Sequence, residues 1–286
     1  KIEGQTLDVS IPMPAGARFN AYTRREPVGV VAGIVPWNFP MMIALWKLMP
    51  ALACGCTIVI KPADETPLTV LRLAELAIQA GIPAGVFNVL LGRGLVAGAA
   101  LVAHPLVSKV SFTGSTEVGK QVGGTALQNM TRFTLELGGK NPMLVLPDAD
   151  LDKALAGAIG GGLLNQGQVC AAASRFFVHA SCYDAFVERL GAQVAELKIG
   201  AGMDPQAQIN PLVSRRQQES VLQHLQVARD QGARIVCGGN RPELPGYFVE
   251  PTVLAGVNDD MTIAREEIFG PVLSVLKYED LDVAVA

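Results

Sequence analysis

The sequence predicts a protein of two α/β domains, the first of them doubly wound. Short apolar runs rich in β-branched residues alternate with segments of helical period along most of the chain. The runs of the first half are apolar on both faces, which is typical of a parallel sheet covered on both sides. With 286 residues and 50% hydrophobic content, the chain is long enough to form two cores of ordinary size.

The elements follow in order from the N-terminus. Residues 1–27 alternate polar and apolar side chains around two short runs with Pro and Gly between them, which predicts a β-hairpin and a contact between subunits. The first α/β domain is predicted over 28–139, with strands at 28–35, 57–61, 86–90, 107–112 and 132–136 and helices near 41–53, 66–80, 95–103 and 116–127. The second is predicted over 140–286, with strands at 143–146, 175–179, 234–237, 248–254 and 271–278 and helices near 151–164, 182–197 and 214–231.

The two ends suggest an internal piece of a longer chain. The sequence begins at Lys1 without a Met, and residues 279–286 have the pattern of a helix that has only begun. We therefore expect both domains to be truncated.

Composition excludes several classes of partner. The net charge is -3 and no Lys/Arg cluster is interleaved with aromatic residues, so nucleic acid is not expected to bind. No apolar run reaches the roughly 20 residues of a membrane span. The five cysteines are odd in number, lack paired CxxC elements and accompany three scattered histidines, so neither a disulfide framework nor a metal site is predicted. A cytoplasmic location fits this cysteine usage.

Two segments are the first candidates for chemistry. Glu136 ends a strand just before Gly138 and Gly139, and Cys170 lies in a loop of small and polar residues. A thiol that a substrate can approach and a separate carboxylate suggest covalent catalysis with a general base. The alternative is a buried cysteine and an ordinary strand end. Since Glu136 closes the first domain and Cys170 belongs to the second, a cleft between domains is where both could face one substrate.

Polar residues also follow the first two predicted strands, at the edge where open α/β sheets bind ligands. Asn38 could stabilise an oxyanion, or it could cap the next helix. Lys61 and Asp64 could hold the hydroxyls of a ribose. The alternative there is helix capping, with Thr66 before Pro67 at the first helical position.

A glycine-containing turn joins the fourth predicted strand to a helix. Gly114, Thr116 and Gly119 form a variant of the dinucleotide-binding fingerprint. Gly114 permits a tight turn, Ser115 can donate to a phosphate, and a helix N-terminus favours an anion. Glu117 in the first helical turn mildly opposes a phosphate.

Five segments, in order and spacing, resemble signatures of the NAD(P)-dependent aldehyde dehydrogenase superfamily, and the resemblance covers the whole chain. They are Pro36-Trp37-Asn38-Phe39-Pro40, Phe112-Thr113-Gly114-Ser115-Thr116, Leu135-Glu136-Leu137-Gly138-Gly139-Lys140, Gln166-Gly167-Gln168-Val169-Cys170 and Glu266-Glu267-Ile268-Phe269-Gly270-Pro271-Val272. The resemblance implies an aldehyde dehydrogenase-like fold, with a Rossmann-type cofactor domain and a second, catalytic α/β domain, and an EC 1.2.1.- activity.

The resemblance also implies roles for single residues. Cys170 would attack the aldehyde carbon, Asn38 would hold the oxyanion, Glu136 would activate the hydrolytic water, and Lys47 would be a buried charge behind them. The cofactor would be held by Ile34, Pro36, Trp37, Lys61, Asp64, Gly94, Gly114, Ser115, Val118, Leu137, Glu267 and Phe269. Many NAD-using members have Glu where this chain has Asp64, so NAD is expected and NADP is left open.

The substrate is the least specific part of the resemblance. Segments 22–35 and 207–214 look most similar to bacterial phenylacetaldehyde dehydrogenases, and Phe39, Ile43, Trp46 and Val169 would form an apolar tunnel wall. Apolar residues at helical spacing are equally what a core requires. The full-length protein is expected to be a homodimer or homotetramer. Alternatives are a coenzyme-A-acylating or semialdehyde-specific member, a cysteine hydrolase or acyl-transferase, and a non-catalytic descendant.

Overall fold

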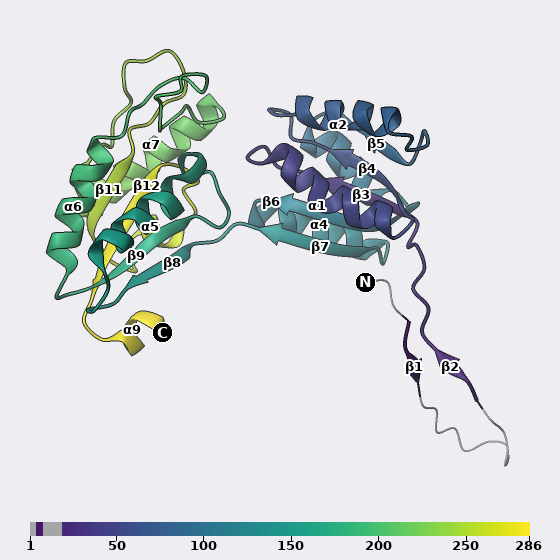
Figure 1. The fold of residues 1–286 in the computed structure, drawn as a ribbon, viewed down its shortest axis with the longest axis horizontal. Coiled ribbons are helices and arrows are strands. Elements are labelled where there is room, and N and C mark those ends of the chain that lie inside the picture. Colours follow the sequence, from purple (N-terminus) through teal and green to yellow (C-terminus); the bar gives the residue numbers. More distant parts are fainter. Residues whose placement is uncertain (1–3, 8–18) are drawn as a thin grey trace. The chain divides into compact units, whose positions relative to one another are not determined.

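The computed structural model describes residues 4–7 and 19–286, and the chain divides into two compact units, Lys1–Glu136 and Leu137–Ala286 (Figure 1). The sequence places the domain boundary in the same stretch, after Gly139. Glu136 is thus the last residue of the first unit, and Cys170 belongs to the second. No helix among the described residues is long and apolar enough to cross a membrane.

The N-terminal hairpin is present in the described residues. Strand β1 (Thr6–Leu7) pairs antiparallel with β2 (Ala21–Tyr22), and the Thr23 hydroxyl accepts a hydrogen bond of 2.8 Å from the backbone N–H of Gln5. The rest of the predicted hairpin, at 8–18, lies outside the described residues. The predicted contact with another subunit stays a prediction.

The sheet of the first unit is ordered β5-β4-β3-β6-β7. Its strands are β3 (Val30–Ile34), β4 (Thr57–Lys61), β5 (Phe87–Val89), β6 (Val107–Gly114) and β7 (Arg132–Leu137). Strand β3 pairs in parallel with both β4 and β6. The chain therefore starts in the middle, winds out to β5, and returns to the other side at β6. The point where the order reverses lies between the carboxyl ends of β3 and β6, where sheets of this kind bind ligands.

Helices cover both faces of this sheet. The neighbours Val31 and Ala32 in β3 point to opposite faces, and both are buried. The helices are α1 (Pro40–Ala53), α2 (Leu68–Gln79), α3 (Ala99–Ala103) and α4 (Thr116–Gln128). Helix α1 packs on β3 and β4, whereas α3 and α4 pack on β6. The single helix predicted at 95–103 is a π-helical turn, η1 (Gly94–Gly98), that continues into α3.

The sheet of the second unit is ordered β10-β11-β12-β9-β8, with an antiparallel β10–β11 pair at one edge and parallel pairs elsewhere. Its strands are β8 (Asn141–Val145), β9 (Ala173–His179), β10 (Arg234–Cys237), β11 (Thr252–Val257) and β12 (Val272–Tyr278). Its helices are α5 (Leu151–Leu163), the 3-10 turn η2 (Leu164–Gly167), α6 (Tyr183–Ala195), α7 (Arg215–Asp230), α8 (Thr262–Arg265) and α9 (Leu281–Val285).

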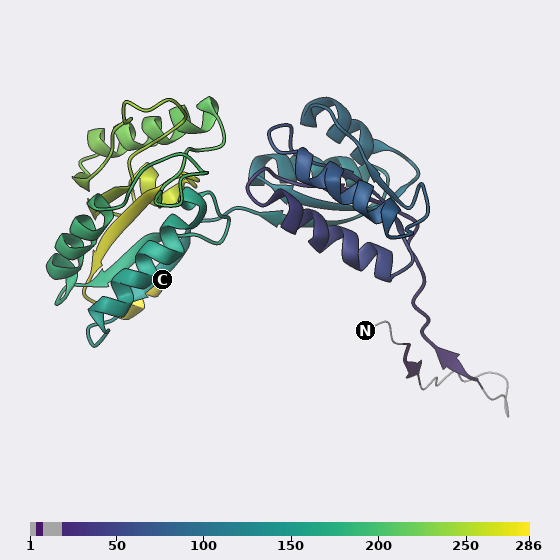
Figure 2. The ribbon, with the colours of Figure 1, turned by 45° about the horizontal axis from the view of Figure 1, so that its top comes forward.

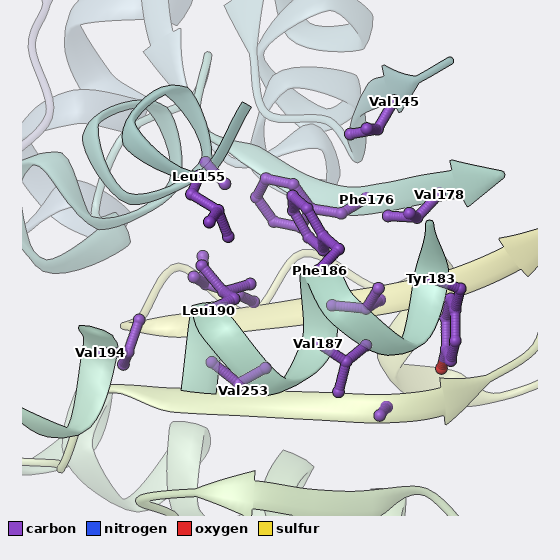
Figure 3. Close-up of a cluster of buried hydrophobic side chains, with 14 of the residues drawn as sticks. Val145, Leu155, Phe176, Val178, Tyr183, Phe186, Val187, Leu190, Val194 and Val253 are labelled. Atoms are coloured by element: carbon purple, nitrogen blue, oxygen red, sulfur yellow. The ribbon is translucent and has the colours of Figure 1, made fainter. Parts of the chain in front are cut away.

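Alternate residues of the strands build two cores on opposite faces. Phe176 and Val178 of β9 join one cluster with Leu155, Phe186 and Leu190 of α5 and α6 (Figure 3). The intervening residue of β9, Phe177, joins a second cluster that includes the buried face of α7. Figure 2 shows the light green α7 on one side of the yellow strands and the teal α5 on the other. Because side chains alternate between the two faces of a strand, β9, which follows Cys170, packs against a helix layer on each face.

One predicted strand is displaced. The strand predicted at 248–254 is observed at Thr252–Val257. Phe248 and Val249 are buried, but the Phe248 carbonyl accepts from the side chain of Gln218 in α7, at 2.7 Å, and not from a neighbouring strand. A buried apolar run therefore needs no sheet ladder when a helix side chain satisfies its backbone.

Candidate active site

Two turns meet at the carboxyl edge of the first unit. Ile34, near the end of β3, lies opposite Lys61 of β4 and Phe112 of β6, so the segments after these strands share one edge. Helix α1 begins after Phe39, so Asn38 lies one residue before the N-cap position. The predicted cofactor residues Pro36 and Trp37 belong to the same turn.

Thr66 links two of these turns, and its predicted role in capping is wrong. Helix α2 begins at Leu68 with Pro67 at the N-cap position and no side-chain cap. The Thr66 hydroxyl instead donates to the carbonyl of Trp37 at 3.3 Å. The turn after β4 is thereby tied to the turn after β3.

Lys61 and Asp64, the residues predicted to hold a ribose, form an ion pair. The Lys61 Nζ lies 2.6 Å from Asp64 Oδ1. The ammonium is buried, whereas the Asp64 side chain is 47% exposed. The lysine thus fixes a carboxylate that still faces outward, as a group that binds hydroxyls must.

The Gly114 turn opens α4 with a side-chain cap. Ser115 Oγ accepts from the backbone N–H of Val118 at 3.4 Å, which leaves its own hydroxyl hydrogen for another acceptor. A Cβ at Gly114 would lie 2.6 Å from the ring of Phe112. The glycine is therefore required by the packing of that ring, in addition to any ligand. Gly94, a more distant predicted cofactor residue, starts the π-helical turn η1.

Lys47 is the buried charge that the resemblance implies. Its Nζ donates to Thr113 Oγ1 at 2.8 Å and to Ser111 Oγ at 3.1 Å, both on β6. Burial lowers the pKa of Lys47 to about 8, the charge of Glu136 opposes that shift, and Lys109 adds to it. Lys47 and Glu136 are therefore electrostatic neighbours within the first unit. The Glu136 side chain itself is exposed at the end of β7.

The predicted tunnel residues separate in the structure. Trp46 is 64% exposed and lines an open pocket of about 630 Å³ together with Lys47. Ile43 is only 3% exposed and belongs to the core beneath α1, and Phe39 packs against that core. Ile43 thus packs in the core of the first unit, whereas Trp46 lies on its surface, and the tunnel wall stays a prediction.

The loop before Cys170 in the second unit has an unusual backbone. Asn165, Gln166 and Gly167 have φ angles of 48°, 57° and 69°, three left-handed residues in a row. A Cβ at Gly167 would lie 2.7 Å from the carbonyl carbon of Gly270. Only surrounding contacts can hold non-glycine residues in this region of φ, which costs of order 1–3 kcal/mol each.

Gln168 supplies several of those contacts. It is buried, its Nε2 donates to the carbonyl of Asn165 at 3.1 Å, and its Oε1 accepts from the backbone N–H of Val213 at 3.0 Å. Asn165 Nδ2 donates in return to the carbonyl of Gln168 at 3.4 Å. The half-buried Cys170 thus follows a loop that is tied to itself and to a distant segment. The sequence gives no signal for this role of Gln168, because a glutamine is ordinary in a loop of small and polar residues.

Glu267 folds back on the glycine pair. The backbone N–H of Gly139 donates to Glu267 Oε1 at 3.4 Å, and a Cβ at Gly138 would lie 2.5 Å from Glu267 Cδ. Burial raises the pKa of Glu267, an effect that the Gly139 N–H and the charge of Lys140 oppose. The absence of a side chain at Gly138 therefore makes room for Glu267.

Lys140 has a further buried ammonium group, and it lies near the Glu267 carboxylate. Its Nζ is buried and has no hydrogen-bond partner among the described residues. Burial lowers the pKa of Lys140 to about 8, Arg175 adds to the shift, and Glu267 opposes it. Arg175 also donates through Nε to the Lys140 carbonyl at 3.0 Å.

A small cavity of about 20 Å³ lies in the second unit, with room for one water molecule. Three predicted site residues, Val169, Glu267 and Phe269, line it together with Ser174, whose buried Oγ has no partner among the described residues. Phe269 has a φ of 56°. Leu137, a further predicted cofactor residue, is the last residue of β7. No three His, Cys, Asp or Glu side chains of the described chain are grouped as metal ligands.

Comparison with known proteins gives one family. The model of the aldehyde dehydrogenase family matches residues 1–286. The chain is 55% identical over 282 residues to the Bacillus subtilis (strain 168) protein DhaS and 48% identical over 283 residues to a phenylacetaldehyde dehydrogenase of Pseudomonas fluorescens. These alignments cover 99% and 98% of this chain but only 56% of each relative, so the chain spans little more than half their length.

Solved structures similar to this chain have the same fold. An aldehyde dehydrogenase from Bacillus cereus in complex with NAD+ is 47% identical, with a TM-score of 0.94 over 100% of this chain and 57% of that one. An NADP-dependent enzyme from E. coli is 42% identical, with a TM-score of 0.94 over 100% of this chain and 58% of that one. The predicted fold is thereby confirmed.

Proposed function

The chain belongs to the aldehyde dehydrogenase family, and we propose that the full-length protein oxidises an aldehyde to the free carboxylic acid with NAD. The observation that carries the proposal is the thiol loop, which Gln168 holds in place and which contributes Val169, the neighbour of Cys170, to the cavity that Glu267 and Phe269 line. A purely structural role requires neither a half-buried thiol on so constrained a backbone nor an outward-facing carboxylate held by Lys61.

The residues of the first unit fit a dinucleotide. The N-terminus of α4 lies at the reversal point of the sheet, with Gly114 and Ser115 before it, and Asp64 faces outward on its lysine. A carboxylate here accepts from a 2′-hydroxyl and repels a 2′-phosphate, which favours NAD over NADP. When bound, NAD supplies the hydride acceptor. The residues proposed to hold it are Ile34, Pro36, Trp37, Lys61, Asp64, Gly94, Gly114, Ser115, Val118, Leu137, Glu267 and Phe269.

The chain's own groups divide the chemistry. The Cys170 thiolate adds to the aldehyde carbon, and Asn38 with the Cys170 N–H holds the oxyanion that forms. Loss of hydride from that carbon leaves a thioester. Glu136 takes a proton from water, the water oxygen adds to the thioester carbon, and the C–S bond breaks to give the acid and the free thiol. Lys47, which Glu136 influences electrostatically, supplies positive charge near the base.

We propose an aryl aldehyde, with phenylacetaldehyde first, as the substrate. The relative of that name supports this choice, and the apolar side chains Phe39, Trp46 and Val169 are compatible with it. We also propose a homo-oligomer, which light scattering of the full-length protein would test.

The test is NADH formation by the full-length protein with phenylacetaldehyde, acetaldehyde and a semialdehyde. We expect the highest kcat/KM for phenylacetaldehyde. Cys170→Ala should abolish turnover, whereas Cys182→Ala, a half-buried cysteine elsewhere, should leave it unchanged. Glu136→Gln should give a burst of NADH and then stall.

Other outcomes identify the alternatives. An acyl-coenzyme-A product would mean a coenzyme-A-acylating enzyme. Full activity in Cys170→Ala, or no NADH from any aldehyde, would contradict the mechanism.

A further inference from the structure

The start of β8 lies beside the backbone of Cys170. Strand β8 begins with Asn141 and Pro142, and it pairs in parallel with β9, the strand that follows the Cys170 loop. Proline has no N–H to donate, and the register of the pair shifts between these two residues. The ladder therefore has no backbone donor at Pro142, and the Cys170 carbonyl lies before the start of β9.

The side chain of Asn141 supplies a donor there. Its Nδ2 donates to the carbonyl of Cys170 at 2.7 Å and to the carbonyl of Ala172 at 3.3 Å. Both bonds span about thirty positions of sequence and are made by one half-buried amide group. The Asn141 side chain therefore adds two amide–carbonyl hydrogen bonds to the backbone that joins Cys170 to β9, beyond the bonds of the β8–β9 ladder.

We propose that Asn141 is a positioning residue for the thiol: its amide fixes the peptide group that follows Cys170 and so sets where Sγ lies. The inference rests on the proposed function and deepens it. On the N-terminal side, Gln168 already ties the loop to Val213 and to its own backbone. On the C-terminal side, Asn141 binds the carbonyl of Cys170 itself.

The two sets of hydrogen bonds matter because the loop that leads to Cys170 has a strained backbone. Asn165 and Gln166 have left-handed backbone conformations, so the backbone relaxes when a hydrogen bond that holds the loop is lost. Loss of the Asn141 donor frees the Cys170 peptide to rotate, which moves both the thiol and the backbone N–H of the same residue. Groups bound to Glu267 on the other side of the segment, such as the Gly139 N–H, stay in place.

The experiment compares Asn141→Ala with Asn141→Ser in the full-length protein. Alanine removes the donor, and serine keeps a shorter hydroxyl donor. Alkylation of Cys170 by iodoacetamide is followed by mass spectrometry of its peptide, without NAD or aldehyde. In Asn141→Ala we expect both this rate and kcat to fall about tenfold, the effect of one lost hydrogen bond. The KM for NAD should stay within about twofold, and serine should recover most of both rates.

Asn129→Ala is the matched control, because Asn129 Nδ2 donates to the Ala103 carbonyl at 2.8 Å in the first unit. It should leave both rates unchanged. Rates in Asn141→Ala within about twofold of wild type, or a serine variant as slow as the alanine variant, would overturn the inference. If alanine prevents folding, the isosteric Asn141→Asp takes its place with the same expectation.

Alkylation needs no turnover, which separates this proposal from the proposed function. A protein that makes no NADH but shows the expected alkylation pattern would refute the dehydrogenase and leave the role of Asn141 standing. An active dehydrogenase whose Cys170 is alkylated at an unchanged rate in Asn141→Ala would refute the role of Asn141 and leave the proposed function standing.

Discussion

Replacing Gly138 by alanine should displace Glu267 while leaving the fold intact. The new Cβ would lie 2.5 Å from Glu267 Cδ, which is closer than any real Cβ contact. The obstacle is the end of a flexible side chain, so we expect the carboxylate to swing away and give up its bond to the Gly139 N–H. Gly139→Ala is a matched control, because a Cβ there would meet only Asn141 Oδ1, at 3.9 Å.

The effect on stability should be small. A hydrogen bond to a charged group contributes about 1.5–3 kcal/mol. The lower limit applies, because 3.4 Å is longer than the usual N–H···O distance. Alanine offsets about 0.4–1 kcal/mol of this by restricting the unfolded chain. We therefore expect Gly138→Ala to lower the unfolding free energy by only about 0.5–1 kcal/mol in urea.

The effect on the cofactor should be larger. If Glu267 holds the nicotinamide ribose, its displacement removes a charge-assisted bond, equivalent to about a 10- to 150-fold rise in the Kd for NAD. Fluorescence titration without aldehyde measures that Kd in both variants. An affinity in Gly138→Ala equal to that in Gly139→Ala would show that Glu267 does not contribute to NAD binding from this position.

Two further substitutions test the buried Lys47 and the backbone of the thiol loop. The pKa of Lys47 is lowered to about 8, so between about pH 8 and 10.5 the unfolded chain holds a proton that the folded one has lost, and stability should rise with pH. Lys47→Met should reduce the slope of unfolding free energy against pH by up to about 1.4 kcal/mol per pH unit. Plots of urea unfolding free energy against pH that run parallel for the two proteins would contradict this expectation. Gly167→Ala should cost about 3–5 kcal/mol, because its φ is 69° and its Cβ would meet the Gly270 backbone. Gly160→Ala, with nothing within 4 Å, should be neutral or slightly stabilising, and equal melting temperatures for the two variants would refute the contact.

Strand positions were readable from sequence wherever local pattern and tertiary packing agree. Strands β4 and β10 have the predicted bounds, because polar or small residues end each apolar run on both sides. The strand predicted at 248–254 failed because the run is buried by contact with α7, which pattern cannot distinguish from a ladder. Ile43 and Trp46 are three positions apart on one helix, and sequence alone does not say which faces the sheet.

The candidate site shows a different limit. Cys170, Glu136 and Lys61 could be singled out from their motifs, since chemistry restricts which residue types are suitable. The left-handed backbone of Asn165 and Gln166 could not be predicted from sequence, because neither residue is a glycine and only contacts in the fold hold them in this conformation. The same holds for Thr66, whose hydroxyl could cap a helix by sequence but bonds to Trp37 in the fold.

Segment 138–141 is hydrogen-bonded to two parts of the second unit that are distant from it in sequence. Its Gly139 N–H binds Glu267, which is 128 positions away, and its Asn141 amide binds the Cys170 carbonyl, 29 positions away. A side chain at Gly138 would exclude the first contact, and loss of the Asn141 amide would remove the second. Because one short backbone segment carries both ties, a shift of that segment moves the carboxylate and the thiol together. Each residue in it is therefore constrained by partners distant in the chain more than by its neighbours.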